Sequence, residues 1–255
     1  MKKIINWKLF GVLLGAGVFG FLALLPYILA VQADALAELP IPLPTALLLS
    51  LVQTTVLVGI AIFFGLFLGK KVGLGAPLLS EWLAGSSIKE KMKPLCFLSI
   101  KLGALAGVLI IGFDYVFTQF MEPISTVSAP LWQGFLGSFY GGIVEEILLR
   151  LFLVTLIVWI IWKFTKTDDG KPTNTSIWIA IIVAAAIFGL GHLPATALLT
   201  TITPIVIFRA ILLNGIGGII FGWLYWKKGL EAAIIAHFTA DIVLLVVLPA
   251  LLTLN

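Results

Sequence analysis

Seven long apolar stretches constrain this chain more than any other feature of its sequence. A helix that crosses about 30 Å of hydrocarbon needs roughly 20 apolar residues. Of the 255 residues, 61% are hydrophobic and 11% are charged, whereas soluble domains have about 25% charged residues. The sequence therefore predicts an all-α, polytopic bundle of about seven transmembrane helices, within residues 9–31, 45–68, 95–117, 132–162, 176–193, 204–226 and 230–252.

The connections between these stretches are too short to form a soluble domain. The longest, residues 70–94, contains an apolar segment around Trp82 that we expect to lie at the membrane interface. The first stretch is longer than the apolar core of a signal peptide, about 7–15 residues, and is predicted to be a retained helix. We therefore predict that residues 1–255 form one membrane domain.

The lysines predict an orientation, because basic residues accumulate in cytoplasmic loops. Alternate connections carry no lysine, and the only charges there are Asp34, Glu38 and Glu122. This pattern predicts an inside amino terminus in a multi-pass protein of the cell membrane. The formal charge of +4 then reflects topology and does not indicate nucleic-acid binding. The basic connections contain Lys2, Lys3 and Lys8; Lys70, Lys71, Lys89, Lys91 and Lys93; Lys163, Lys166 and Lys171; and Lys227 and Lys228.

The fourth stretch, residues 132–162, is too long for one upright span, and Gly141 and Gly142 lie near its middle. We expect a break there, which would give eight helices, or a strong tilt, or a helix that projects beyond the bilayer. Cys96 is the only cysteine, so an intrachain disulfide is excluded.

Glu145, Glu146 and Arg150 follow these glycines. Residues four apart share a helix face, so Arg150 is predicted to pair with Glu146 while Glu145 points about 100° away. Glu145 is then a candidate general base. The alternative is a buried ion pair that only fixes helix packing.

His192 ends an apolar segment in which Gly189 and Gly191 are expected to allow a neighbouring helix to approach closely. An imidazole there can bind a water molecule or a metal ion, or it can be a core histidine that bonds to a neighbour. Phe188, one turn earlier, is expected to pack.

His237 and Asp241 also lie four apart and are the third polar group in an apolar stretch. They can jointly hold one oxygen atom or one cation. In the alternative interpretation, the Asp241 carboxylate only fixes the tautomer of His237.

Ionisable side chains within spans are costly unless they are paired or face a wet cavity. Together the three motifs supply a base for water, a group to position it, and donors or a metal to stabilise an oxyanion. The sequence therefore favours a hydrolase, with residues 141–241 as its catalytic core. A proton-coupled or cation-coupled transporter and a non-catalytic immunity or scaffold protein are the alternatives.

The order Glu-Glu-x-x-x-Arg, Phe-x-x-x-His and His-x-x-x-Asp on successive spans resembles the CPBP intramembrane protease family, which includes CAAX prenyl endopeptidases and bacterial Abi or bacteriocin-immunity proteins. The resemblance implies an endopeptidase that cleaves a peptide or membrane-associated protein. It implies that Glu145 activates water, that Glu146 and Arg150 support it, that His192 positions the water, and that His237 with residue 241 stabilises the oxyanion.

The family pattern has Asn or Asp at the position of Asp241, and the CAAX endopeptidases tend to carry Asn there. An ionised carboxylate cannot donate to an oxyanion, so Asp241 is protonated, orients His237, or helps to bind a divalent cation. Glu145, His192, His237 and Asp241 would suit zinc, but the sequence contains no His-Glu-x-x-His motif. A metal-free glutamate mechanism fits the same residues.

Two features complicate this interpretation. The depth of each residue can be counted from the cytoplasmic boundary at about 1.5 Å per residue, if all helices are straight and start at the same level. His237 would then lie roughly 10–15 Å nearer the inner side of the membrane than Glu145 and His192. The hydrolase hypothesis therefore requires the helices to shift or bend. Arg209, in the sixth stretch, is predicted to pair with an acid of the cluster or to meet a substrate carboxylate.

Overall fold

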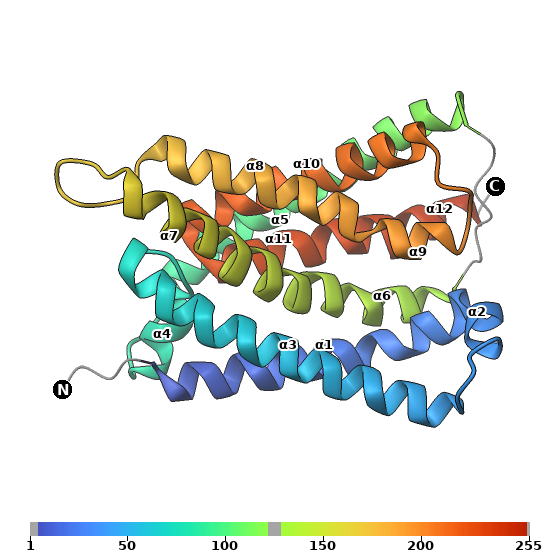
Figure 1. The fold of residues 1–255 in the computed structure, drawn as a ribbon, viewed down its shortest axis with the longest axis horizontal. Coiled ribbons are helices and arrows are strands. Elements are labelled where there is room, and N and C mark those ends of the chain that lie inside the picture. The colour runs from blue at the N-terminus through green and yellow to red at the C-terminus, as the bar shows by residue number, and fades with distance from the viewer. Residues whose placement is uncertain (1–4, 122–128, 254–255) are drawn as a thin grey trace.

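All regular structure in the described part of the chain, residues 5–121 and 129–253 of a computed structural model, is helical (Figure 1). The all-α prediction is therefore confirmed. The elements are α1 (Trp7–Val31), α2 (Ala33–Ala37), α3 (Leu43–Val72), α4 (Pro77–Leu83), α5 (Lys89–Thr118), α6 (Leu131–Phe139), η1 (Tyr140–Glu145), η2 (Ile147–Val154), α7 (Thr155–Phe164), α8 (Asn174–Gly191), α9 (Leu193–Ala197), α10 (Pro204–Lys228), α11 (Leu230–Ile242), η3 (Val243–Val247) and α12 (Leu248–Leu252).

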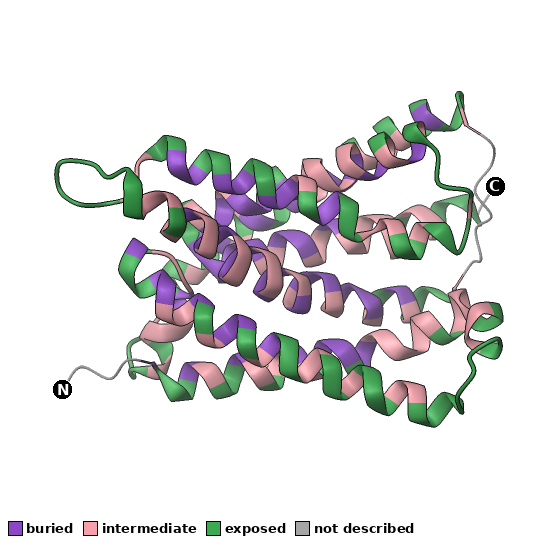
Figure 2. Ribbon diagram, viewed as in Figure 1, coloured by how far each residue is buried: buried purple, intermediate pink, exposed green. Residues whose placement is uncertain are grey.

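Seven helical stretches within the described residues are long and apolar enough to cross a membrane, which confirms the predicted bundle. Large apolar side chains such as Leu48, Phe97 and Val108 are exposed on its outer surface. Figure 2 shows the buried residues on the helix faces that meet inside the bundle. An apolar exterior of this kind suits a hydrocarbon solvent and makes this a multi-pass membrane protein.

The fourth span runs without interruption from Leu131 to Phe164, through α6, η1, η2 and α7. The expected break at Gly141 and Gly142 is therefore absent. Instead, the helix is wound as π-helix over η1 and η2, with Glu146 between them. Such winding is rare and is frequently found at functional sites.

The two ends of the bundle differ in charge. In Figure 1, α1 begins at the left end, where α4 and the connection between α7 and α8 also lie, and α12 ends at the right. The final turns of α3, α7 and α10 carry lysines at the left end, whereas α2, with Asp34, lies at the right. This arrangement agrees with the predicted alternation, while the side that faces the cell interior stays a prediction. Lys2, Lys3 and Glu122 lie outside the described residues.

Glycines set the closest helix contacts in the core. A methyl group at Gly189 of α8 would lie 2.5 Å from the Cα of Ile211 in α10, so this predicted close approach is confirmed. The prediction for Gly191 is wrong, because a methyl group there would meet no heavy atom within 4 Å. Gly103 similarly lets α5 lie against the backbone of Ala236 in α11. These contacts pack α8 against α10 and α5 against α11, and α8, α10 and α11 also contact the π-helical segment.

Candidate active site

Glu146 and Arg150 form a buried ion pair on the fourth span. The Glu146 Oε1 atom lies 2.8 Å from Nη1 of Arg150, and both side chains are almost fully buried, which confirms the predicted pairing. Nη2 of Arg150 donates to the carbonyl oxygen of Gly218 in α10 at 3.4 Å. The guanidinium also lies over the rings of Phe188 and Phe221, 5.3 and 5.5 Å from their centroids. Arg150 thus joins the fourth span to α8 and α10.

His237 is held by the same carboxylate. Its Nδ1–H donates to Glu146 Oε1 at 2.7 Å, and its ring stacks on Phe221 with centroids 4.7 Å apart. Glu146 therefore fixes the tautomer of His237. The alternative interpretation of the third motif assigned this role to Asp241. Glu146 and His237 are 91 positions apart, so no local spacing could have predicted this bond. The buried Glu146 carboxylate thus binds both Arg150 and His237.

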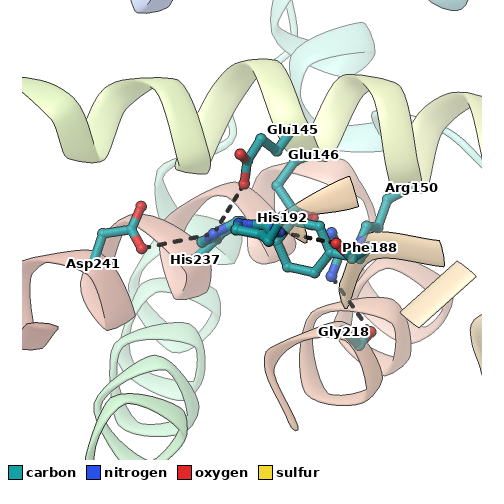
Figure 3. Close-up of polar contacts among 8 residues, drawn as sticks. All are labelled: Glu145, Glu146, Arg150, Phe188, His192, Gly218, His237 and Asp241. Atoms are coloured by element: carbon teal, nitrogen blue, oxygen red, sulfur yellow. Dashed lines mark hydrogen bonds and ion pairs between the residues drawn. The ribbon is translucent and has the colours of Figure 1, made fainter. Parts of the chain in front are cut away.

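The second ring nitrogen of His237 faces two further carboxyl groups. Its Nε2 atom lies 3.6 Å from Oε2 of Glu145 and 3.7 Å from Oδ1 of Asp241 (Figure 3). The Glu145 and Asp241 side chains are 22% and 18% exposed, while that of Glu146 is fully buried. Of the three acids, Glu146 is therefore occupied by strong partners, and the other two retain accessible oxygen atoms.

Gly141 leaves the space beside this nitrogen. A methyl group at position 141 would strike the Asp241 carboxylate and would lie 3.1 Å from Nε2 of His237. Gly142 permits the backbone to approach Phe238 in the same way. The paired glycines, for which a helix break was one of the expectations from the sequence, thus serve as a close contact between the fourth span and α11. Their position three and four residues before Glu145 is the only sequence signal that could have indicated this role.

His192 lies at the end of α8 and is connected to the cluster through Phe188. Its Nδ1–H donates to the Phe188 carbonyl oxygen at 2.9 Å, so that nitrogen is satisfied locally, as in the core-histidine alternative. In a neutral imidazole the Nε2 atom is then an acceptor. The Phe188 ring contacts the rings of His192 and His237, with centroids 4.7 and 5.8 Å apart, which confirms its packing role.

The expected difference in depth between the motifs does not occur. Nδ1 of His237 lies 2.7 Å from Glu146 and its Nε2 lies 3.6 Å from Glu145, so the spans are shifted or bent relative to the straight, level helices assumed from the sequence. His237 consequently lies level with Glu145 and Glu146, as the contacts above require. This shift satisfies the condition that the hydrolase hypothesis set.

The donor atoms do not form a metal site. Among residues 5–121 and 129–253, no group of three or more His, Cys, Asp and Glu side chains is arranged to hold a metal ion. We therefore derive no step through zinc.

The prediction that Arg209 pairs with an acid of the cluster is wrong. Its Nε and Nη2 atoms both lie 2.6 Å from Oδ1 of Asp114, which links α10 to α5. Arg209 thus belongs to a separate ion pair. Local spacing could not predict this pair either, since the two residues are 95 positions apart.

Comparison with known families bears on the residues just described. Residues 127–243 match the type II CAAX prenyl endopeptidase Rce1-like family. This match covers slightly less than half of the chain, contains all three motifs, and confirms the resemblance to the CPBP and CAAX family. It supports a CAAX-type intramembrane protease in general. No curated protein and no solved structure shows a significant match to the chain.

Proposed function

We propose that this chain is an intramembrane endopeptidase of the cell membrane, in which Glu145 activates water to hydrolyse a peptide bond of a peptide or membrane-associated protein. One observation carries the proposal. Glu145 and Asp241 both approach the same nitrogen of His237, whose other nitrogen is bonded to Glu146. The Rce1-like match over the same residues supports proteolysis.

The two adjacent glutamates have different tasks in this mechanism. Glu146 is bound by Arg150 and His237 and is fully buried, so its carboxylate serves to position the imidazole. Glu145 is partly exposed and lies 3.6 Å from Nε2 of His237, beyond hydrogen-bond distance, so its oxygen atoms can accept a proton from water. As that proton moves to Glu145, the water oxygen bonds to the carbonyl carbon of the substrate.

His237 and Asp241 face the negative charge that develops on the carbonyl oxygen. Because Nδ1–H is committed to Glu146, a protonated imidazole presents Nε2–H to the oxyanion. The Asp241 carboxylate, 3.7 Å from Nε2, balances the charge of that imidazolium. When the carbon–nitrogen bond breaks, Glu145 returns its proton to the leaving amine. His192, with Nδ1–H on Phe188, orients the attacking water through Nε2.

The test compares new peptide termini in membranes from cells that produce the wild-type protein, Glu145→Gln or Glu38→Gln at matched levels. The Glu38→Gln control makes the same chemical change at an exposed acid that follows α2, outside the cluster. Quantitative mass spectrometry should detect termini that are present with the wild type and with Glu38→Gln and lost with Glu145→Gln. Such termini would also identify the substrate.

Identical termini in all three membranes, under conditions in which the cells require the protein, would contradict the proposal. In that case a transport assay would separate the other candidate classes. Substrate or ion flux that depends on Glu145 would indicate a carrier, whereas a phenotype that survives Glu145→Gln would indicate a scaffold or immunity protein.

A further inference from the structure

A large cavity lies at the lysine-rich end of the bundle, away from the three motifs. Its volume is about 1150 Å³, above the roughly 300–1,000 Å³ of most small-molecule sites. Its walls come from the start of α1, the end of α3, the turn before α4, the first half of α5, and the junction of α10 with α11. The cavity therefore lies at one end of the spans, where we expect the surface of the bilayer.

The cavity combines charge with apolar surface. No acidic residue occurs among the described residues that line it, although Glu81 outside it pairs with one of its lysines, Lys91, at 2.7 Å. The Lys227 ammonium lies 3.3 Å from the centre of the Trp226 ring, which also lines the cavity. Leu9, Leu66, Leu74 and Leu95 supply apolar wall. Its basic residues are Lys8, Lys70, Lys91, Lys227 and Lys228.

We infer that this cavity binds an anionic phospholipid, with the phosphate near Lys8, Lys227 and Lys228 and an acyl chain against the leucines. Basic pockets between transmembrane helices bind lipid head groups, and clustered lysines attract anionic lipids. The leucine wall distinguishes this site from one for a free phosphate, which has no apolar part to bury. The lipid would tie the ends of α1, α3 and α10 together, separately from the proposed catalysis.

Two double variants test the inference because the chain offers a matched control. Lys227→Gln/Lys228→Gln removes two charges from the cavity. The control, Lys163→Gln/Lys166→Gln, removes two charges from the same end of the bundle but outside the cavity. Like Lys227, these lysines lie beside a tryptophan ring, that of Trp162. All four lysines are exposed, so neither change disturbs the core.

The full-length protein would be placed in nanodiscs of phosphatidylcholine or of an equal mixture with phosphatidylglycerol, and the lipids retained would be counted by native mass spectrometry. We expect the wild type and the Lys163/Lys166 variant to retain phosphatidylglycerol selectively. We expect the cavity variant to bind it about tenfold or more weakly, as the loss of two lysines from a lipid site implies.

Three results would overturn the inference. In the first, the wild type shows no preference for phosphatidylglycerol over phosphatidylcholine. In the second, both double variants lose the preference for phosphatidylglycerol to the same extent, which would indicate a general effect of surface charge. In the third, the melting temperature of the protein in detergent rises as much when inorganic phosphate is added as when phosphatidylglycerol is added. The ligand would then be a soluble phosphate. None of these readouts depends on peptide cleavage, so the failure of this inference and the failure of the proposed protease function are distinguishable.

Discussion

The ion pairs Glu146–Arg150, within the fourth span, and Asp114–Arg209, between α5 and α10, both lie in the apolar spans, but only the first is part of a larger cluster. The Glu146–Arg150 pair is almost fully buried, and its carboxylate also accepts a bond from His237. The Asp114–Arg209 pair links α5 to α10 with side chains that are 36% and 22% exposed. A membrane-embedded ion pair is therefore not itself a sign of catalysis. What distinguishes the first pair is the additional carboxyl groups of Glu145 and Asp241 around the same histidine.

The largest expected effect is on the rate of peptide cleavage, and it should come from Glu145 with little loss of stability, unlike its neighbour Glu146. Glu145→Gln should reduce the rate of peptide cleavage at least about 100-fold, because general-base catalysis contributes about 10²–10⁴-fold. The melting temperature should change little, since Glu145 is partly exposed and lies 3.6 Å from His237. Initial rates on the substrate identified from the new termini, together with thermal unfolding in detergent, would measure both quantities. A large loss of stability would instead make Glu145 a structural acid.

Glu146→Gln should damage both stability and activity. It removes one partner of a buried pair, which typically costs about 3–5 kcal/mol because an uncompensated charge, here Arg150, remains buried. It also replaces the carboxylate that holds Nδ1 of His237. The unfolding midpoint and the cleavage rate of the fraction that stays folded would be measured. If neither the unfolding midpoint nor the cleavage rate changed, the Glu146 carboxylate would neither stabilise the bundle nor position His237, which would contradict the role proposed for it.

Gly141→Ala should lower activity by roughly tenfold, because misplacement of a catalytic group by about 1 Å can cost up to 100-fold. The added methyl group would meet the Asp241 carboxylate and His237 Nε2. Gly215→Ala is the matched control, since a methyl group there meets no heavy atom within 4 Å. Equal rates for the two variants would show that the space beside His237 is not used by substrate or water.

The same comparison explains what the sequence could predict. The seven spans and the Glu146–Arg150 pair depend on apolar length and on spacing along one helix, so both were predictable. The bond between His237 and Glu146 depends on how separate spans are shifted relative to one another, which no local pattern contains. The partner of Arg209 was missed for the same reason. The π-helical winding also could not be predicted from the sequence. The glycines Gly141 and Gly142 within it are as compatible with a helix break as with a close contact between helices.

The smallest effect is expected at the second ion pair. Asp114→Asn should lower stability by about 1 kcal/mol or less, because partly exposed pairs contribute about 0.2–1 kcal/mol. Cleavage should be unchanged, since neither Asp114 nor Arg209 contacts the cluster around His237 in the interactions described above. A double-mutant cycle with Arg209→Gln, measured by thermal unfolding, would isolate the pair's contribution. If Asp114→Asn reduced cleavage without reducing stability, Arg209 would be coupled to the substrate or to the cluster, and the contrast between a structural and a catalytic ion pair would not hold.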